Sequence, residues 1–352
     1  MGYFRPEIEA IAGYKPGEQP QGGKFIKLNT NENPYPASPK VAEAIRQRLD
    51  QGLEKYPDPI GTAFRIRAAE VLGVEPDWIL CGNGSDDILT ILTRGFVGDG
   101  EWLRLPTPSY ILYKTLAEIQ GADSEEIQFN EDWTLPESFG TASNHLKLAF
   151  LPNPNSPSGT VVPKKQLREI ADSLPCPILI DEAYADFADD NCIDLVKENE
   201  KIMVSRTLSK SYALAGLRFG FLVAQPQMIE QLMKVKDSYN CDALSLAGAL
   251  AAIDDQKWVA ENKAKVVVTR ASMTQRLRKM GFTVPDSQAN FVWATRPGVK
   301  LKPIYEFLKQ NHVLIRYMQY PGITEGIRIS VGTDGQTDVC LELIEQYLQQ
   351  NS

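Results

Sequence analysis

The sequence of 352 residues is poor in the residues on which several classes of protein depend. Its two histidines, His145 and His312, are too few for histidine-based triads or histidine-rich metal sites, so we expect no bound metal. Its five cysteines are scattered and form no Cys-x-x-Cys pair, which indicates free thiols in a reducing compartment. No apolar run approaches the ~18 residues that span a bilayer, and Met1 to Arg5 begin no signal peptide. We therefore expect a cytoplasmic protein without a membrane segment.

Positive charge is also scarce. The chain has 37 Lys and Arg against 45 Asp and Glu, a formal net charge of -8, and no run of basic residues forms a local arm. This balance repels nucleic acid phosphates and anionic membrane surfaces, so neither is an expected partner. The hydrophobic content of 43% and the length are those of a globular protein with one large domain and a smaller companion.

Short apolar segments alternate with amphipathic ones through much of the chain. Strands are predicted at Lys147–Leu151, Pro177–Ile180 and Lys201–Ser205, with a helix over Lys164–Leu174 between the first two. Strands separated by helices predict an α/β fold with a mostly parallel sheet that is covered by helices on both faces.

The C-terminal part follows a different pattern. A long helical stretch over Ser245–Arg278 precedes short strands and one further helix, which predict a smaller α+β domain. The Gly- and Pro-rich opening reads as an arm that packs on another part of the protein. We expect an N-terminal arm at 1–30, a large domain at 31–245 and a small domain at 246–352. The predicted strands of the small domain are Phe282–Val284, Phe291–Trp293, Val313–Arg316 and Ile327–Ser330, and its helix is Lys302–Asn311.

Polar side chains follow three successive predicted strands. Asn155, Asp181 and Lys210 each come just beyond an apolar strand, where ligands of open α/β sheets bind. A lysine amine can form a Schiff base with pyridoxal phosphate, and a buried carboxylate favours the protonated ring nitrogen of that cofactor. Tyr184 could reach the phenolic oxygen of the ring. Taken alone, Asp181 would also fit a helix cap; the combination predicts a pyridoxal phosphate site.

Anion-binding groups occur around the same region. Gly84, Ser85 and Asp86 lie in a glycine turn before a predicted helix, whose N-terminus can hold a phosphate. Ser209 and Arg218 flank Lys210 and could bind the same phosphate.

Three further side chains are candidates for the cofactor ring and the substrate. Tyr110 could stack on the ring, although it also fits ordinary packing. Arg328 alternates with apolar residues along a strand, a pattern that fits either a solvent-exposed charge or a clamp for a substrate carboxylate or phosphate. Arg316 is the second candidate for that anion.

Six ordered motifs resemble those of fold-type I pyridoxal phosphate-dependent aminotransferases, class II, and are most similar to the histidinol-phosphate aminotransferase family. The resemblance covers nearly the whole chain. The motifs are Asn31-Glu32-Asn33-Pro34, the turn at 82–87, the loop at 155–159, Asp181-Glu182-Ala183-Tyr184, Thr207 to Lys210 with Gly216-Leu217-Arg218, and Ile327 to Gly332.

The resemblance implies transfer of an amino group between L-histidinol phosphate and a 2-oxo acid, 2-oxoglutarate, in histidine biosynthesis. It implies a homodimer with shared active sites, in which Tyr56 reaches the cofactor phosphate of the other subunit. It assigns Tyr14, Asn33 and Arg328 to the substrate. Lys210, Asp181 and Tyr184 are the implied catalytic residues.

One motif departs from the family pattern. Where the family has Asn before the Pro of Asn-Pro-Thr-Gly, this chain has Ser156, and Asn155 comes one residue early. We expect Asn155 to contact the phenolic oxygen, with Ser156 as the alternative. Two other activities fit the same scaffold: transamination of an aromatic amino acid and decarboxylation of phosphothreonine.

Overall fold

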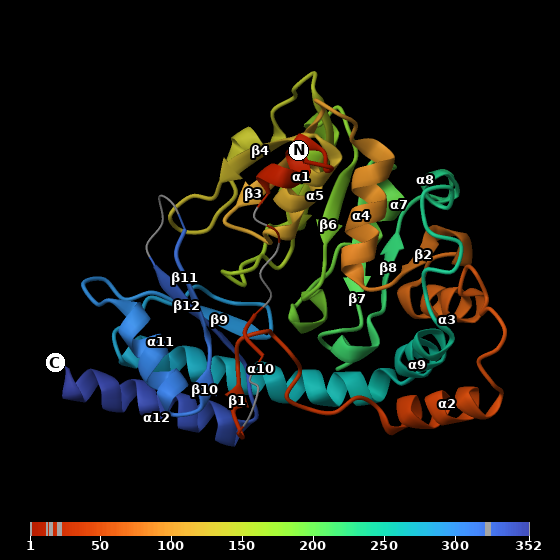
Figure 1. The fold of residues 1–352 in the computed structure, drawn as a ribbon. Helices are drawn as coiled ribbons and strands as arrows, with labels where there is room; N and C mark the ends of the chain where they lie inside the picture. Colours follow the sequence, from red (N-terminus) through yellow and green to blue (C-terminus); the bar gives the residue numbers. More distant parts are fainter. Residues whose placement is uncertain (1, 12, 14–16, 20–22, 321–324, 352) are drawn as a thin grey trace.

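The computed structural model describes residues 2–11, 13, 17–19, 23–320 and 325–351. In this part of the chain, two sheets each carry their own layer of helices, and one long helix, α10 (Gln256–Lys279), runs along the base of both (Figure 1). The predicted fold class, with its large α/β part and its smaller α+β part, is confirmed. No helix among the described residues is long and apolar enough to cross a membrane.

The large sheet has the strand order β2-β8-β7-β6-β5-β3-β4. Only β8 runs antiparallel to its neighbours, so the sheet is mostly parallel, as predicted. Its strands are β2 (Ile79–Gly82), β3 (Trp102–Thr107), β4 (Asp123–Gln128), β5 (Leu146–Pro152), β6 (Ile178–Asp181), β7 (Ile202–Thr207) and β8 (Gly220–Val223).

Both faces of the large sheet are apolar, because successive residues of a strand point to opposite faces. In β6, Ile178 and Ile180 join the core on one face, while Leu179 joins the core on the other. The first face is covered by α2 (Pro39–Asp50), α3 (Thr62–Leu72), α6 (Lys164–Ser173), α7 (Ile193–Glu198) and α9 (Ala243–Asp254). The second is covered by α4 (Ser85–Phe96), α5 (Leu112–Gln120) and α8 (Pro226–Leu232), and α1 (Pro6–Ala10) lies against α5.

The small sheet is antiparallel and has the order β11-β12-β9. Its buried side chains form a core of their own with α10, α11 and α12. The N-terminal segment joins this part of the molecule, since β1 (Ile26–Lys27) pairs in parallel with β10 (Val313–Leu314). The remaining elements are β9 (Phe291–Ala294), β11 (Arg316–Met318), β12 (Gly326–Ser330), α11 (Leu301–Gln310) and α12 (Asp334–Gln350).

Three predicted elements of the C-terminal part differ from the structure. The helical stretch predicted at Ser245–Arg278 is two helices, α9 and α10, interrupted at Asp255, whose carboxylate accepts a hydrogen bond from Ser38 Oγ at 2.5 Å. The strand predicted at Val313–Arg316 divides into β10 and β11, because the chain changes pairing partner there. Phe282–Val284 contributes one isolated bridge, Thr283 to Thr295, and no strand.

Candidate active site

Lys210 lies just beyond β7, at the carboxyl edge of the large sheet. Its Nζ donates to the Thr30 carbonyl oxygen at 3.2 Å and lies 5.8 Å from the centre of the Tyr184 ring. The Asn33 side-chain amide donates to the backbone carbonyls of Lys210 and Ser211, both at 3.0 Å. The N-terminal segment therefore binds the backbone of the lysine loop, and the lysine amine lies near the Tyr184 ring.

Asp181 is the last residue of β6 and is only 5% exposed. Its carboxylate accepts hydrogen bonds from Tyr113 Oη at 2.6 Å and Ser205 Oγ at 2.9 Å. Burial raises the pKa of Asp181, against the opposing effect of these two hydroxyls. A buried carboxylate of this kind favours a cationic partner, which would restore its ionised form.

Tyr184 follows Asp181 on the same loop. Its hydroxyl oxygen accepts a hydrogen bond from Asn31 Nδ2 at 3.0 Å, and its ring meets the Phe291 ring edge-on at 4.9 Å between centres. The contact with Phe291 brings a residue of the small sheet to the predicted site.

An anion cradle forms where β2 turns into α4. Gly84, with φ at 85°, precedes the first residue of α4, and the first backbone N–H groups of a helix have no partner within the helix. A Cβ atom at Gly84 would lie 2.6 Å from Arg218 Nη2, which shows how closely the guanidinium approaches the turn. Arg218 also contacts Asp86 at 3.2 Å and Ser209 Oγ at 3.5 Å.

Tyr110 and Asn155 line the neighbouring loops. Tyr110 Oη donates to Asp86 at 3.2 Å, so its ring lies beside the cradle. Asn155 is buried, and its amide donates to Ser158 Oγ at 3.0 Å and to the Pro108 carbonyl at 3.3 Å. Its Oδ1 has no hydrogen-bond partner among the described residues.

Arg316 and Arg328 face each other directly across β11 and β12. Arg328 donates to Ser156 Oγ at 2.9 Å and to the Asn29 carbonyl at 3.0 Å. Tyr320 lies beside this pair: burial raises its pKa to about 12, and the two arginine charges oppose the rise. Like charges placed opposite each other destabilise a sheet, so this pair is suited to an anion that lies between them.

Two predicted site residues are not connected to this group by any contact described above. Tyr56 is 80% exposed and stacks on Tyr239, with ring centres 4.4 Å apart. Tyr14 lies outside the described residues.

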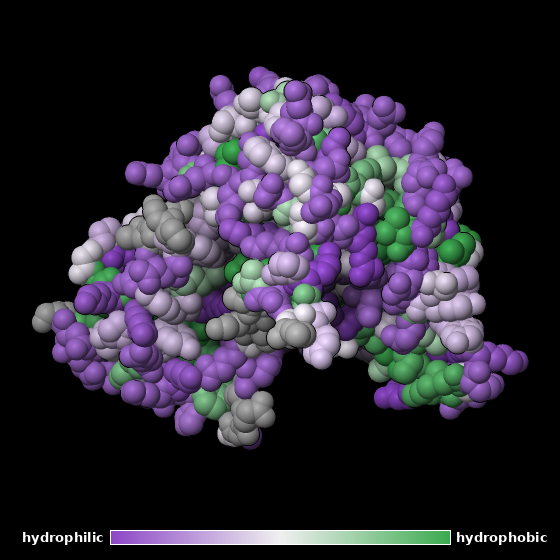
Figure 2. Space-filling model, turned by 45° about the horizontal axis from the view of Figure 1, so that its top comes forward, coloured by the Kyte–Doolittle hydropathy of each residue, from purple (hydrophilic) through white to green (hydrophobic). Residues whose placement is uncertain are grey.

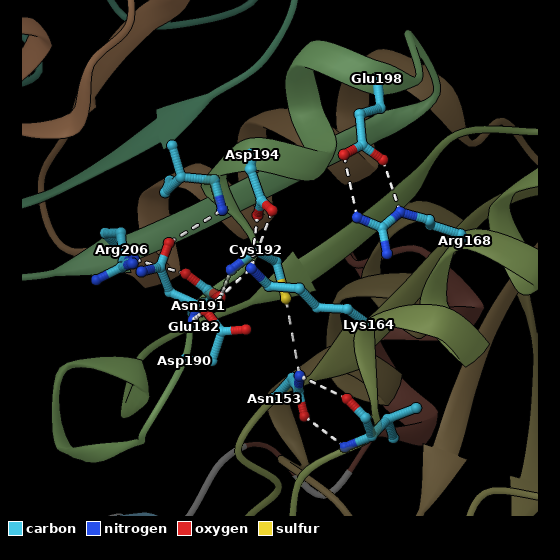
Figure 3. A network of polar contacts seen from close by, with 12 residues as sticks. Asn153, Lys164, Arg168, Glu182, Asp190, Asn191, Cys192, Asp194, Glu198 and Arg206 are labelled. Carbon is cyan, nitrogen blue, oxygen red and sulfur yellow. Dashed lines mark hydrogen bonds and ion pairs between the residues drawn. The ribbon is translucent and has the colours of Figure 1, made fainter.

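A buried ion network joins two loops of the site, and Figure 3 shows its Glu182–Arg206 pair. Glu182, directly after Asp181, is paired with Arg206 of β7 at 2.7 Å, and Arg206 also contacts Asp186 at 2.6 Å. Asp186 in turn accepts a short hydrogen bond from Ser211, the residue after Lys210. The network therefore joins the loop that carries Asp181 to the loop that carries Lys210.

Three residues at the site were not predicted from the sequence. Tyr113 and Ser205 hold Asp181, and Asn31 holds Tyr184. A signal for Tyr113 exists, because it stands three residues after Tyr110 at the start of α5. Asn31 begins the first of the six family motifs, but no local pattern predicts its contact with Tyr184, which lies 153 positions away in the chain.

Comparison with known proteins identifies the family. A family model described as aminotransferase class I and II matches residues 23–344. The histidinol-phosphate aminotransferase of Rhodopirellula baltica is 58% identical over 98% of this chain and 96% of its own, and the histidinol-phosphate aminotransferase 1 of Trichormus variabilis is 44% identical over 99% of both. The chain belongs to the histidinol-phosphate aminotransferase family. It is an aminotransferase whose cofactor is pyridoxal phosphate.

Solved structures agree on the fold. The histidinol-phosphate aminotransferase of Sinorhizobium meliloti, solved with pyridoxal-5'-phosphate, aligns with a TM-score of 0.89 at 24% identity over 99% of both chains. An aromatic aminotransferase of Pyrococcus horikoshii aligns with a TM-score of 0.82, also at 24% identity, over 98% of both chains. Enzymes with different names share this fold, so the fold alone does not select the amino donor.

The described residues fit this cofactor. The buried carboxylate of Asp181 suits a protonated ring nitrogen, and the cradle of Gly84 and Arg218 suits a phosphate. The amine of Lys210 lies 5.8 Å from the centre of the Tyr184 ring, and Lys210 follows β7 at the same edge of the sheet. When bound there, pyridoxal phosphate supplies an electron sink for a substrate carbon next to an amine.

Proposed function

We propose that this aminotransferase moves the amino group of L-histidinol phosphate to 2-oxoglutarate, as a step of histidine biosynthesis. The observation that supports this most directly is the 58% identity to the Rhodopirellula baltica enzyme of that name, over nearly the full length of both chains. The pair Arg316 and Arg328 adds a chemical reason, because two arginines in register on neighbouring strands could bind the phosphate of such a donor and the carboxylates of a 2-oxo acid.

In this proposal Lys210 is the group that moves protons. Its Nζ would accept the proton that leaves the substrate carbon beside the amine. It would then deliver this proton to a carbon atom of the cofactor. Asp181 keeps its negative charge against the ring nitrogen, which holds that nitrogen in its protonated form. The Tyr184 hydroxyl would donate a hydrogen bond to the phenolic oxygen of the cofactor.

The other assignments concern binding. Asn155 remains the proposed second contact of the phenolic oxygen. Its amide already has two acceptors, however, so Ser156 is the alternative. Tyr110 stacks on the ring. The proposed phosphate ligands are Gly84, Ser85, Asp86, Ser209 and Arg218, and the proposed substrate ligands are Tyr14, Asn33, Arg316 and Arg328.

The partner assignment is a homodimer with shared sites. The exposed Tyr56 supports it, because one side of its ring packs on Tyr239 and the exposed remainder is available to a neighbour's cofactor phosphate. We expect a cytoplasmic enzyme, and the division into 1–30, 31–245 and 246–352 stays a prediction. The side chains of α9, which begins before residue 246, pack in the core of the large sheet across the predicted boundary.

Subunit complementation tests the shared site. Lys210→Ala and Tyr56→Ala variants are purified separately, unfolded or dissociated together, and reassembled. In a mixed dimer one site combines the intact lysine of one chain with the intact tyrosine of the other, so random assembly restores roughly a quarter of the wild-type sites. Sedimentation gives the assembly state. No recovered activity in confirmed mixed dimers would contradict the assignment of Tyr56.

The donor is tested by adding histidinol phosphate, phenylalanine and phosphothreonine separately to the purified enzyme with its cofactor. The proposal expects histidinol phosphate to convert the cofactor to its amino form fastest, which its absorbance reports. Faster conversion by phenylalanine would replace the proposed donor by an aromatic one. Carbon dioxide release from phosphothreonine, without consumption of an oxo acid, would favour the decarboxylase.

A further inference from the structure

Residues 28–31 form a connecting segment between the two sheets at the active site. The segment runs beside β12, since Leu28 accepts a backbone hydrogen bond from Ser330 at 2.9 Å. Its next three residues each contact a different active-site group. The Asn29 carbonyl accepts from Arg328 at 3.0 Å, the Thr30 carbonyl from Lys210 at 3.2 Å, and the Asn31 side chain donates to Tyr184 at 3.0 Å.

Asn31 is held at every polar group that the structure describes. It is 1% exposed, and its carbonyl accepts from Asn290 Nδ2 at 2.9 Å. Its backbone N–H donates to Ser330 Oγ, and Ser330 Oγ donates to Asn31 Oδ1, both at 2.9 Å. Such complete pairing is expected of a buried polar side chain whose orientation matters.

These contacts determine which end of the Asn31 amide faces Tyr184. A backbone N–H can only donate, so the Ser330 oxygen accepts there and the hydroxyl proton must go elsewhere. That proton goes to Asn31 Oδ1, which leaves the NH2 end of the amide toward Tyr184. The Tyr184 oxygen consequently accepts from Asn31, and its own proton is available for another acceptor.

We propose that Asn31 is a positioning residue that directs the hydroxyl proton of Tyr184 toward the phenolic oxygen of the cofactor. A hydroxyl that accepts one hydrogen bond donates a stronger second one, because the two bonds polarise each other. This inference rests on the role proposed above for Tyr184. It adds that the direction of the Tyr184 hydrogen bond is set by the segment that also contacts Lys210 and Arg328.

The expected effect has a definite sign. The phenolic oxygen carries negative charge beside the nitrogen through which Lys210 holds the cofactor, and that charge keeps a proton on the nitrogen. A hydrogen bond from Tyr184 spreads the charge, so the nitrogen loses its proton at lower pH. Weakening this bond should therefore raise the pH midpoint of the cofactor's absorbance change.

The remaining ionisable groups near Tyr184 are unchanged when Asn31 is replaced. They are Lys210, and Tyr113 with its partner Asp181. On the side of the small sheet, the Phe291 ring separates Tyr184 from Arg328, whose guanidinium carbon lies 5.3 Å from the Phe291 centre. A difference in midpoint between variants at position 31 therefore reports on position 31.

The variants are chosen for the backbone of Asn31, whose φ is 56°. Asp and Gly tolerate this left-handed conformation better than other residues, so Asn31→Asp and Asn31→Gly limit added strain. Asp replaces the donor by an acceptor, which turns the Tyr184 proton away from the cofactor. Gly removes the contact without adding charge. Tyr184→Phe sets the full effect, and Asn290→Ala is the structural control, because Asn290 holds only the carbonyl of Asn31.

The absorbance of the cofactor-loaded variants is titrated against pH, with unfolding measured in parallel. Asn31→Asp and Asn31→Gly should raise the midpoint in the direction of Tyr184→Phe, by about half a unit to one unit. Asn290→Ala should lower stability and leave the midpoint in place. If Tyr184→Phe leaves the midpoint unmoved, the role of Tyr184 fails and the inference with it. If Tyr184→Phe moves it and the Asn31 variants do not, Asn31 has no positioning role while the role of Tyr184 stands.

Discussion

Gly220 offers a sharp test of the phosphate cradle, because β8 passes directly beneath the start of α4. A Cβ atom at Gly220 would lie 2.6 Å from the Ser85 backbone nitrogen and 2.8 Å from the Gly84 carbonyl carbon. Ordinary contact begins near 3.4 Å, so in Gly220→Ala the new Cβ and the Ser85 nitrogen must move apart by roughly 0.8 Å. Both of these obstructing atoms, of Ser85 and of Gly84, belong to the backbone. We expect a loss of about 1–3 kcal/mol in the free energy of unfolding.

The larger consequence concerns the cofactor. Binding groups must be held within about 0.5 Å of their productive geometry, so a shift of the first turn of α4 should raise the dissociation constant of pyridoxal phosphate by about 10- to 100-fold. Absorbance titration of the cofactor-free protein measures this constant, and urea unfolding measures the stability. Gly216→Ala is the matched control, because no atom lies within 4 Å of its Cβ position. Wild-type cofactor affinity in Gly220→Ala would refute the position assigned to the cradle.

Three further predictions concern buried and capping groups. Arg206→Met should lower the free energy of unfolding by about 3–5 kcal/mol, because it removes the ion-pair partner of the buried Glu182. Arg168→Met removes one side of an exposed ion pair with Glu198, so it should lower the free energy of unfolding by less in the same urea titration. Burial raises the pKa of Asp181, so its contribution to stability is present below its unfolded-state pKa and lost as pH rises through its folded pKa. Asp181→Asn should therefore raise the melting temperature of the cofactor-free protein at pH 7, by an amount that shrinks toward acid pH, and abolish transamination; an unchanged melting temperature would contradict this. Ser38→Ala should cost about 1 kcal/mol in chemical unfolding, because Ser38 caps α2.

Local sequence patterns were sufficient to predict the site residues that lie at the end of a strand or in the loop directly after it. Asp181 ends β6 and Lys210 follows β7, and in a parallel sheet those ends share an edge, so their proximity followed from alternation of strands and helices. The edge strand β4 escaped prediction because five of its six residues, all except Ile127, are polar and offer no apolar alternation. The division of the predicted strand at Val313–Arg316 escaped for another reason: which strands pair is decided by tertiary contacts.

The contacts that local sequence patterns could not predict are those that join distant segments. Asn31 meets Ser330 across 299 positions, and Arg328 meets Ser156 across 172. Hydrophobic periodicity carries no information about such contacts, because the polar partners are single residues in loops or on one strand. The resemblance placed Asn33 with the substrate, whereas its amide here donates to the carbonyls of Lys210 and Ser211. A substrate contact by Asn33 would therefore have to share an amide that already supports the lysine loop.

Several features of the site would destabilise the protein without its ligands. Arg316 and Arg328 oppose like charges, and Asp181 carries a carboxyl whose pKa is raised by burial. In the proposed complex, the substrate anion reduces the repulsion between the two arginines. The protonated ring nitrogen reduces the cost of the buried Asp181 carboxylate. Ligand binding should thus stabilise the protein by more than the contacts of a neutral site would provide, since it also relieves these charges. Asn31 differs from these groups, because its polar groups are paired within the protein before any ligand binds.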